Sequence, residues 1–173
     1  MKTKKSKEMK TMKQIFATMF VILLVMSITL QLNAKDSNSS STVVEIAASN
    51  PDFSTLVEAV KKANLVDALS ANGPFTVFAP TNEAFDKLFK KLGVSGIKDL
   101  SAEQLTPVLT YHVVSGEVMS TDLSTTWVAT LNGKKIKIDL SNGVHVNDSQ
   151  VIKADIKGKN GVIHVIDKVL IPE

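Results

Sequence analysis

Apolar residues near the middle of the chain recur at the spacing of amphipathic helices. Phe53, Leu56, Val57 and Val60 stand at i, i+3, i+4 and i+7, which places them on one face of a helix. The preceding Pro51-Asp52 pair is typical of a helix start. A second, short helical turn is expected over residues 65–69, before the turn signal Asn-Gly-Pro at 72–74.

A buried strand and a capped helix are predicted next to each other over residues 75–92. Residues 75–79 are aromatic, β-branched or small, and Pro80 ends that run. Thr81 follows as a candidate N-cap, with Glu83 in the first turn, where an acidic side chain suits the helix dipole. The apolar positions of the helix repeat at helical spacing: Phe85, Leu88, Phe89 and Leu92.

A third helix is expected to begin at Ser101, because Ser101 and Gln104 match a capping box. Pro107 lies past the first turn, where it removes a hydrogen bond, so this helix is expected to be kinked or short. His112 shares a helical face with Leu105, Val108 and Leu109, and its ring is therefore expected to turn inward. Tyr111 lies one position round the helix and is expected to reach the surface.

The pattern changes beyond Gly116, where turn signals separate short β-type segments. Asparagine-centred turns recur at 132–133, 142–143, 147–148 and 160–161, and strands are predicted at 135–140, 144–146, 151–156 and 162–171. This half of the chain is predicted to form a β meander. Helices first and strands later predict an α+β domain, with the helices on one side of the strands.

The N-terminus carries the pattern of an export signal. Six lysines in residues 2–13 precede the uncharged, apolar run 15–32, and Ala34 offers a small residue before a cut. We expect residues 1–34 to be removed, residues 35–42 to form a flexible polar spacer, and residues 43–173 to form the domain. The run is also near the length that spans a bilayer, so an uncleaved membrane anchor is the alternative.

The positive charge of the chain belongs to that signal. The formal charge is +3. Without residues 1–34, 14 lysines remain against 16 acidic residues, which is −2. A nucleic-acid partner therefore loses its compositional support, and a membrane partner is expected only if the signal stays uncleaved. The remaining basic runs, Lys134-Lys135 with Lys137 and Lys153 to Lys159, are interpreted as solvated surface.

Cysteine and arginine are both absent from the sequence. The exported chain cannot rely on disulfides, but its 139 residues, 35–173, are enough for one hydrophobic core. A lipoprotein signal is excluded, because it needs a cysteine at the cut. Without arginine there is no bidentate fork for phosphate or carboxylate, so a dedicated phosphate site is not expected.

Three segments occur in a specific order over the expected domain. They are FTVFAPTNEAF at 75–85, YHVVSG at 111–116 and NGVIHVIDKVLIP at 160–172. Together they closely resemble the fasciclin domain: its leading homology box, its central Tyr-His motif and its closing box. The resemblance covers about residues 43–173. Ser115 stands where the family often has proline, which affects local geometry only.

This resemblance implies a wedge of two packed β-sheets with a helical layer, found in secreted and cell-surface proteins. Family members are mostly adhesion or matrix-binding modules. The resemblance also implies that Thr81, Asn82, His112 and His164 are structural, with the side chains of Thr81 and Asn82 as partners of a buried His112 imidazole.

No catalytic or metal-binding pattern is recognisable. His112, His145 and His164 stand in no zinc-ligand spacing, and there is no nucleophile elbow or phosphate loop. His164 shares a strand face with Val162 and Ile166 and is expected to pack, whereas His145 is expected to face solvent. We therefore expect no enzyme activity and no cofactor.

Tyr111 and Trp127 are the candidate partner-binding residues. Trp127 is the only tryptophan, and it is interpreted either as a packed aromatic or as a contact for a glycan or protein. Two functions remain open. One is a secreted, periplasmic or cell-surface adhesion module that binds an extracellular or envelope protein or polysaccharide. The alternative is a carrier of an apolar small molecule such as a carotenoid, in a groove under the helices.

The exported protein is predicted to begin at Lys35. Its intact mass should therefore equal that of residues 35–173, because the signal is removed on export. Mass spectrometry of the extracytoplasmic fraction measures this directly. A mass that retains residues 1–34, recovered from a membrane pellet, would show an anchored protein instead.

Overall fold

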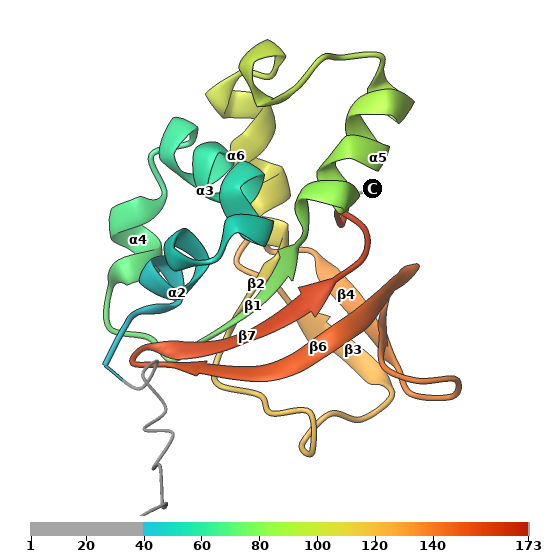
Figure 1. Ribbon diagram of the computed structural model, residues 1–173. Coiled ribbons are helices and arrows are strands. Elements are labelled where there is room, and N and C mark those ends of the chain that lie inside the picture. The colour runs from blue at the N-terminus through green and yellow to red at the C-terminus, as the bar shows by residue number, and fades with distance from the viewer. Residues whose placement is uncertain (1–39, 173) are drawn as a thin grey trace, which may run out of the picture. The chain divides into compact units, whose positions relative to one another are not determined.

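The computed structural model describes residues 40–172 (Figure 1). The expected export signal and the start of the expected spacer lie outside these residues. The helices are α2 (Val43–Ser49), η1 (Pro51–Phe53), α3 (Ser54–Lys62), α4 (Val66–Ser70), α5 (Asn82–Leu92), η2 (Ile97–Asp99) and α6 (Ala102–Tyr111). The strands are β1 (Phe75–Pro80), β2 (Val113–Ser115), β3 (Thr126–Ala129), β4 (Lys135–Asp139), β5 (His145–Val146), β6 (Ser149–Gly158) and β7 (Gly161–Ile166).

The seven strands form one hydrogen-bonded sheet in the order β2-β1-β7-β6-β5-β4-β3. Strands β4 to β7 correspond to the predicted meander, β3 was not predicted, and β1 enters beside β7 as a parallel pair. The long strand β6 belongs to both halves, because it pairs with β5 at Ser149 and Gln150 and with β7 beyond them. The two packed sheets expected of the wedge are thus two halves of one sheet, and the α+β class is confirmed.

The sheet curls until its two end strands meet. Val114 of β2 bridges to Thr130 at the end of β3, and the Leu131 N–H donates to the Val113 carbonyl at 2.8 Å. This curvature is accommodated by irregular pairing in β6, where Asp155 adopts a left-handed φ of 60°. The result is a second interior, separate from the one beneath the helices.

Two hydrophobic clusters fill these two interiors. The larger one packs the helices against β1, β2 and β7, and includes Phe53, Phe85, Leu109 and Ile163. Figure 1 shows the helices gathered on one side of these strands. The smaller cluster lies within the curled half of the sheet, and its members are Phe78, Tyr111, Val114, Ile136, Val146, Ile166 and Leu170.

The predicted N-terminal caps of α5 and α6 form the expected hydrogen bonds. Thr81 caps α5 by accepting from the Ala84 N–H, and Ser101 and Gln104 form the reciprocal capping box of α6. Helix α6 has ten residues and continues past Pro107 to Tyr111. Helix α2 was not indicated by the hydrophobic pattern, because a segment of seven residues is too short for a clear periodicity.

A buried corner at Asn160 and Gly161 joins the N-terminal helices to the sheet. The Asn160 amide accepts from the Val43 N–H at 2.9 Å and donates to the Leu69 and Ala71 carbonyls at 2.8 and 2.9 Å. Gly161 follows with φ 156°, and an added Cβ would lie 2.1 Å from the Phe75 carbonyl oxygen. Only glycine therefore allows β7 to start against β1 here.

Substitution Gly161→Ala is predicted to lower the free energy of unfolding by about 2 kcal/mol or more, because the methyl group overlaps backbone that cannot move aside alone. Urea titration of the exported protein measures the change. Gly96→Ala is the control, since an added Cβ there has no atom within 4 Å. An unchanged Gly161→Ala midpoint beside an unchanged control would contradict this account of the corner.

Candidate functional site

His112 is buried where α6 ends, and it bonds to the C-terminal segment. Its side chain is 2% exposed. The ring nitrogen Nε2 accepts from the Leu170 N–H at 2.9 Å, so Nδ1 carries the proton and donates to the Val108 carbonyl at 2.7 Å. The inward orientation agrees with the helical spacing. The expected partners Thr81 and Asn82 were wrong, because the ring lies toward a segment 58 residues further along the chain.

The environment of His112 keeps the imidazole neutral. Burial lowers its pKa to about 4, against a smaller opposing effect of the Val108 carbonyl. Protonation would place a second N–H against the Leu170 N–H, and this hydrogen bond would be lost. His112 is thus a fixed link between α6 and the C-terminal segment.

Thr81 and Asn82 organise the start of α5 instead. The Asn82 Oδ1 accepts from the Thr55 N–H at 3.0 Å and from the Ser54 hydroxyl, and its Nδ2 donates to the Pro51 carbonyl at 2.9 Å. Thr81 caps the helix and its N–H reaches the Ile166 carbonyl at 3.4 Å. These contacts fix where α5 leaves the sheet.

Tyr111 is buried, and the expectation that it reaches the surface was wrong. Its side chain is 5% exposed because the curled sheet covers the end of α6. The hydroxyl donates to the Lys135 carbonyl at 2.9 Å and accepts from the Asn147 amide at 3.1 Å. The same Asn147 accepts from the Lys137 N–H at 2.9 Å. Tyr111 therefore positions strand β4 from beneath.

A serine, an aspartate and a histidine meet at β6, but their bonding does not suit catalysis. Ser120 donates both its N–H and its hydroxyl to the Asp155 carboxylate. His164 is fully buried, accepts from the Asp155 N–H at Nδ1 and donates to the Val118 carbonyl from Nε2 at 2.9 Å. Both imidazole nitrogens are bonded to backbone groups, so His164 is not placed to accept a proton from Ser120 as it would in a Ser-His-Asp triad. The cluster holds the loop before β3 against the sheet.

The expected surface position of His145 is only partly met, because this side chain is half-buried beside β4 and β6. Among residues 40–172 there is no cluster of three or more His, Cys, Asp or Glu side chains able to hold a metal ion. Within the same residues, no helix is long and apolar enough to cross a membrane.

Trp127 is the most exposed large apolar side chain in the described part of the chain, at 62%. It lies on β3 directly opposite Lys137 of β4, so both side chains extend from the same face of the sheet. That face forms one side of a surface groove of about 1040 Å³.

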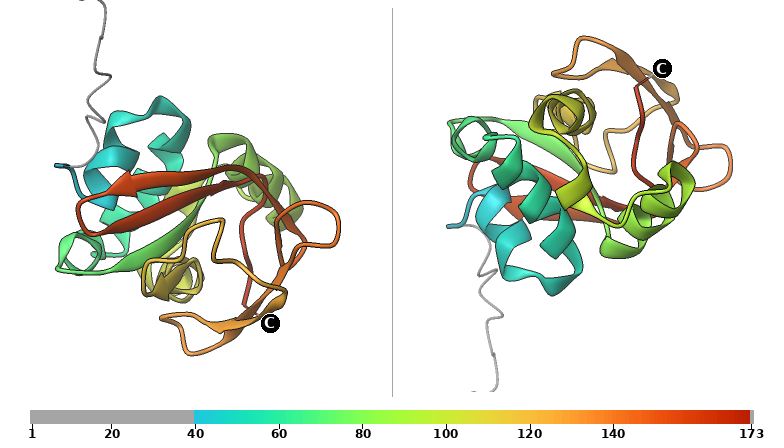
Figure 2. Two further views of the ribbon diagram at one scale, coloured as in Figure 1. Left: turned by 90° about the horizontal axis from the view of Figure 1, so that it is seen from below. Right: turned by 90° about the horizontal axis from the view of Figure 1, so that it is seen from above.

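Three segments that are far apart in the sequence supply most of the lining of this groove, and Tyr111, Asn147 and Asp148 complete it. Helix α5 contributes Leu88 and Leu92, which lie beside its buried phenylalanines, and the exposed Lys87 and Lys91. The β3–β4 hairpin contributes Trp127, Lys134, Lys135 and Lys137, and the C-terminal segment contributes Lys168, Val169 and Ile171. In Figure 2 the C-terminal segment runs from the α5 side toward the curled half of the sheet.

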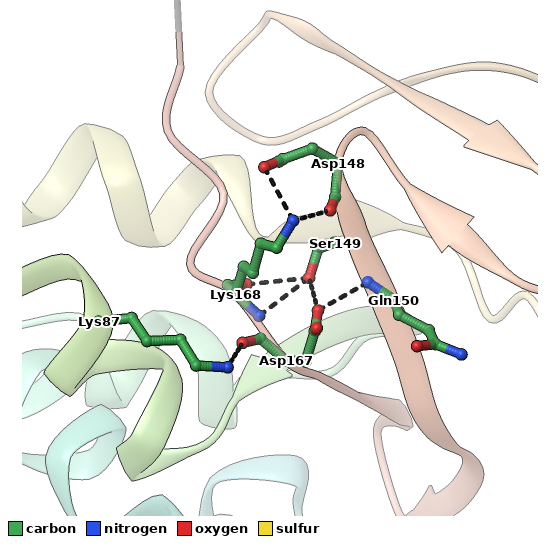
Figure 3. A network of polar contacts seen from close by, with 6 residues as sticks. All are labelled: Lys87, Asp148, Ser149, Gln150, Asp167 and Lys168. Carbon is green, nitrogen blue, oxygen red and sulfur yellow. Dashed lines mark hydrogen bonds and ion pairs between the residues drawn. The ribbon is translucent and has the colours of Figure 1, made fainter.

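A polar network fixes one end of the groove (Figure 3). The Asp167 carboxylate accepts from the Ser149 hydroxyl at 3.1 Å and the Gln150 N–H at 2.7 Å, which ties the end of β7 to the start of β6. Lys168 donates to the Asp148 carbonyl at 2.6 Å, and Lys87 donates to the Asp167 carbonyl at 3.4 Å. Two of the groove's ammonium groups are thus held by backbone oxygens.

The groove is strongly cationic. Its lining holds six lysines and one carboxylate, Asp148, which pairs with Lys168 at 3.3 Å. Just outside the lining, Asp139 pairs with Lys137 at 2.9 Å. Hydrogen bonds from Ser141 and then from Lys137 lower the pKa of Asp139 well below its usual range, so this carboxylate stays charged. Sequence reasoning assigned Lys134, Lys135 and Lys137 to plain surface and missed the groove.

Comparison with known proteins gives consistent matches. A family model described as the fasciclin domain matches residues 51–172. Protein sll1483 of Synechocystis is 48% identical over 137 residues, which are 79% of this chain and 76% of that protein. The cell surface glycolipoprotein MPB83 of Mycobacterium bovis is 35% identical over 136 residues, 75% of this chain and 60% of that protein. None of these matches indicates an enzyme family.

A solved structure shares the fold. It is a FAS1 domain pair from the insect cell adhesion molecule Fasciclin I, with a TM-score of 0.65 and 23% sequence identity. The match covers 76% of this chain and 51% of that one, so this chain corresponds to about half of the pair.

Substitution His112→Ala is predicted to lower the free energy of unfolding by about 1 to 3 kcal/mol at pH 7, because the buried Leu170 N–H loses its acceptor. The measurement is urea unfolding of the exported protein. His145→Ala is the matched control, expected to stay within about 0.5 kcal/mol because that imidazole is only half-buried.

The pH dependence has a definite sign. The folded-state pKa of His112, about 4, lies below the ordinary 6.5, so the unfolded chain binds the extra proton. The contribution of His112 to the free energy of unfolding is fully present above about pH 6.5 and is lost as the pH falls toward 4. Between these limits the stability of the wild type should fall more steeply than that of His112→Ala. Parallel curves would show that His112 does not titrate on unfolding.

Proposed function

This chain belongs to the fasciclin domain family, and on that premise we propose that it is a non-catalytic binding module that acts outside the cytoplasm. Its partner is an extracellular or envelope protein or polysaccharide, bound in the groove between α5 and the β3–β4 hairpin. The observation that carries the proposal is Trp127, which extends 62% exposed beside the lysines of that groove. An indole in this position loses water over a large area when a partner covers it.

The names of two similar proteins support the location and the class of activity. MPB83 is called a cell surface glycolipoprotein, and the structural match comes from a cell adhesion molecule. The lysine-rich start of this chain has the layout of an export signal. We propose that the mature protein is secreted, periplasmic or attached to the cell surface.

The candidate contact residues take different roles in this proposal. Trp127 contacts the partner directly. Tyr111 acts through β4, because its hydroxyl holds the Lys135 carbonyl and Asn147 and so sets the position of the exposed lysines. The groove's six lysines favour a polar or charged partner over a carotenoid, since an apolar ligand would have to desolvate ammonium groups without pairing them.

Substitution Trp127→Ala is predicted to reduce retention of the exported protein on the cell envelope or extracellular matrix by at least about fivefold, because its exposed ring contributes apolar contact area to the complex. The bound fraction after washing is measured with purified protein added back to these fractions. Ile152→Ala on β6 is the matched control, because it also removes an exposed apolar side chain, 56% exposed, outside the groove lining. Equal retention of both variants and the wild type would reject the groove as the binding site.

A further inference from the structure

We propose that the groove binds an acidic polysaccharide, a sugar chain that carries carboxylate or sulfate groups. This inference rests on the proposed binding function and adds the chemistry of the partner. It follows from where the lysines of the fold are placed, from how they are held, and from the aromatic ring among them.

The lysines converge on the groove from three segments. Residues 40–172 contain 13 lysines and 14 acidic residues, so the described domain has almost no net charge. Six of the 13 lysines nevertheless line this one groove, with a single carboxylate among them. If positive and negative side chains were evenly mixed over the surface, the groove lining would hold about as many carboxylates as lysines. The groove is therefore a local positive field on a nearly neutral domain, and this is the complement of a polyanion.

The backbone segments that carry the lysines are held in place before any ligand arrives. Lys135 and Lys137 alternate with the buried Ile136 and Ile138, which keeps both lysines on the groove side of β4. Tyr111 and Asn147 fix the backbone of this strand. Across the groove, Lys87 and Lys91 are one helical turn apart on α5. This arrangement reduces the ordering cost of binding.

The distribution of charge suits a chain of anionic groups better than one small anion. A site for a single phosphate or carboxylate concentrates its donors around one point, commonly with the planar fork of arginine. This chain has no arginine, and its lysines occupy both sides and one end of a volume of about 1040 Å³. Repeated negative charges along a polymer match such spaced point charges.

The aromatic ring selects sugar among the polyanions. Trp127 stands directly across from Lys137, so a flat ring and a lysine side chain extend from one sheet face, with the Lys137 ammonium paired to Asp139. The apolar face of a pyranose ring can stack on the indole while its carboxylate or sulfate pairs with the lysine. Asn147 and Asp148, which also line the groove, supply an amide and a carboxylate for sugar hydroxyls.

Binding of the full exported protein to defined polymers tests the proposal. Polygalacturonate carries carboxylates, dextran sulfate carries sulfates, and dextran is neutral. We expect binding to at least one of the two anionic polymers and none to dextran, measured by titration calorimetry. Raising the salt from about 50 to about 300 mM should weaken binding at least about tenfold, because the ion pairs are screened.

Two variants with the same change in charge separate the groove from general electrostatics. Lys135→Gln with Lys137→Gln should weaken binding at least about tenfold. Lys153→Gln with Lys157→Gln on strand β6 removes two exposed lysines outside the groove and should change affinity less than about twofold. Trp127→Ala should weaken polysaccharide binding about fivefold or more. Circular dichroism and urea midpoints confirm that each variant is folded.

The outcomes distinguish failure of this inference from failure of the proposed function. If Trp127→Ala loses envelope retention while the wild type binds neither anionic polymer, the binding module stands and the acidic polysaccharide is rejected. Binding to an oligonucleotide or to phosphatidylglycerol vesicles as tight as to the polysaccharides, and indifferent to Trp127→Ala, would also overturn the inference. If groove variants alter neither polymer binding nor envelope retention, both proposals fail.

Discussion

The parallel pairing of β1 with β7 depends on one corner, where Asn160 and Gly161 bring backbone from three parts of the chain together. The Asn160 amide satisfies Val43, Leu69 and Ala71 in a buried place where unpaired peptide groups would be costly. Gly161 then lets β7 approach Phe75 so closely that no side chain fits. With β7 fixed there, β6 pairs beside it. Strands β5, β4 and β3 continue from β6 as the curled half of the sheet, and the β3–β4 hairpin forms one side of the groove.

Local structure could be predicted from the sequence because its causes are local. The capping residues Thr81 and Ser101 and the apolar spacing of α5 identify helices without reference to the rest of the fold. Burial of His112 also follows from helical spacing. Its partner could not be predicted, since Leu170 reaches the ring only after the sheet has curled. Tyr111 was misplaced for the same reason, because strand β4 covers a helix position that would otherwise face solvent.

The groove is a long-range feature, and this explains why the charge pattern did not predict it. Lys87 and Lys168 are 81 positions apart, and Lys135 and Lys137 lie in a third segment whose alternation with isoleucines is typical of any half-exposed strand. Each short basic run looks like solvated surface when it is read alone. Only in the folded structure do these lysines line one groove together with Trp127.

The two ends of β7 lie next to different features of the domain, the entry of the described chain at one end and the groove at the other. At the Gly161 end, the Ser41 carbonyl accepts from the Lys159 N–H, so the chain enters the fold beside the β6–β7 turn. At the Ile166 end, the strand leads into Lys168 and the groove between α5 and the β3–β4 hairpin. The length of β7 therefore separates the point where the described chain enters the fold from the groove. A partner bound in the groove would lie at the other end of β7 from Ser41 and would leave this entry of the chain uncovered.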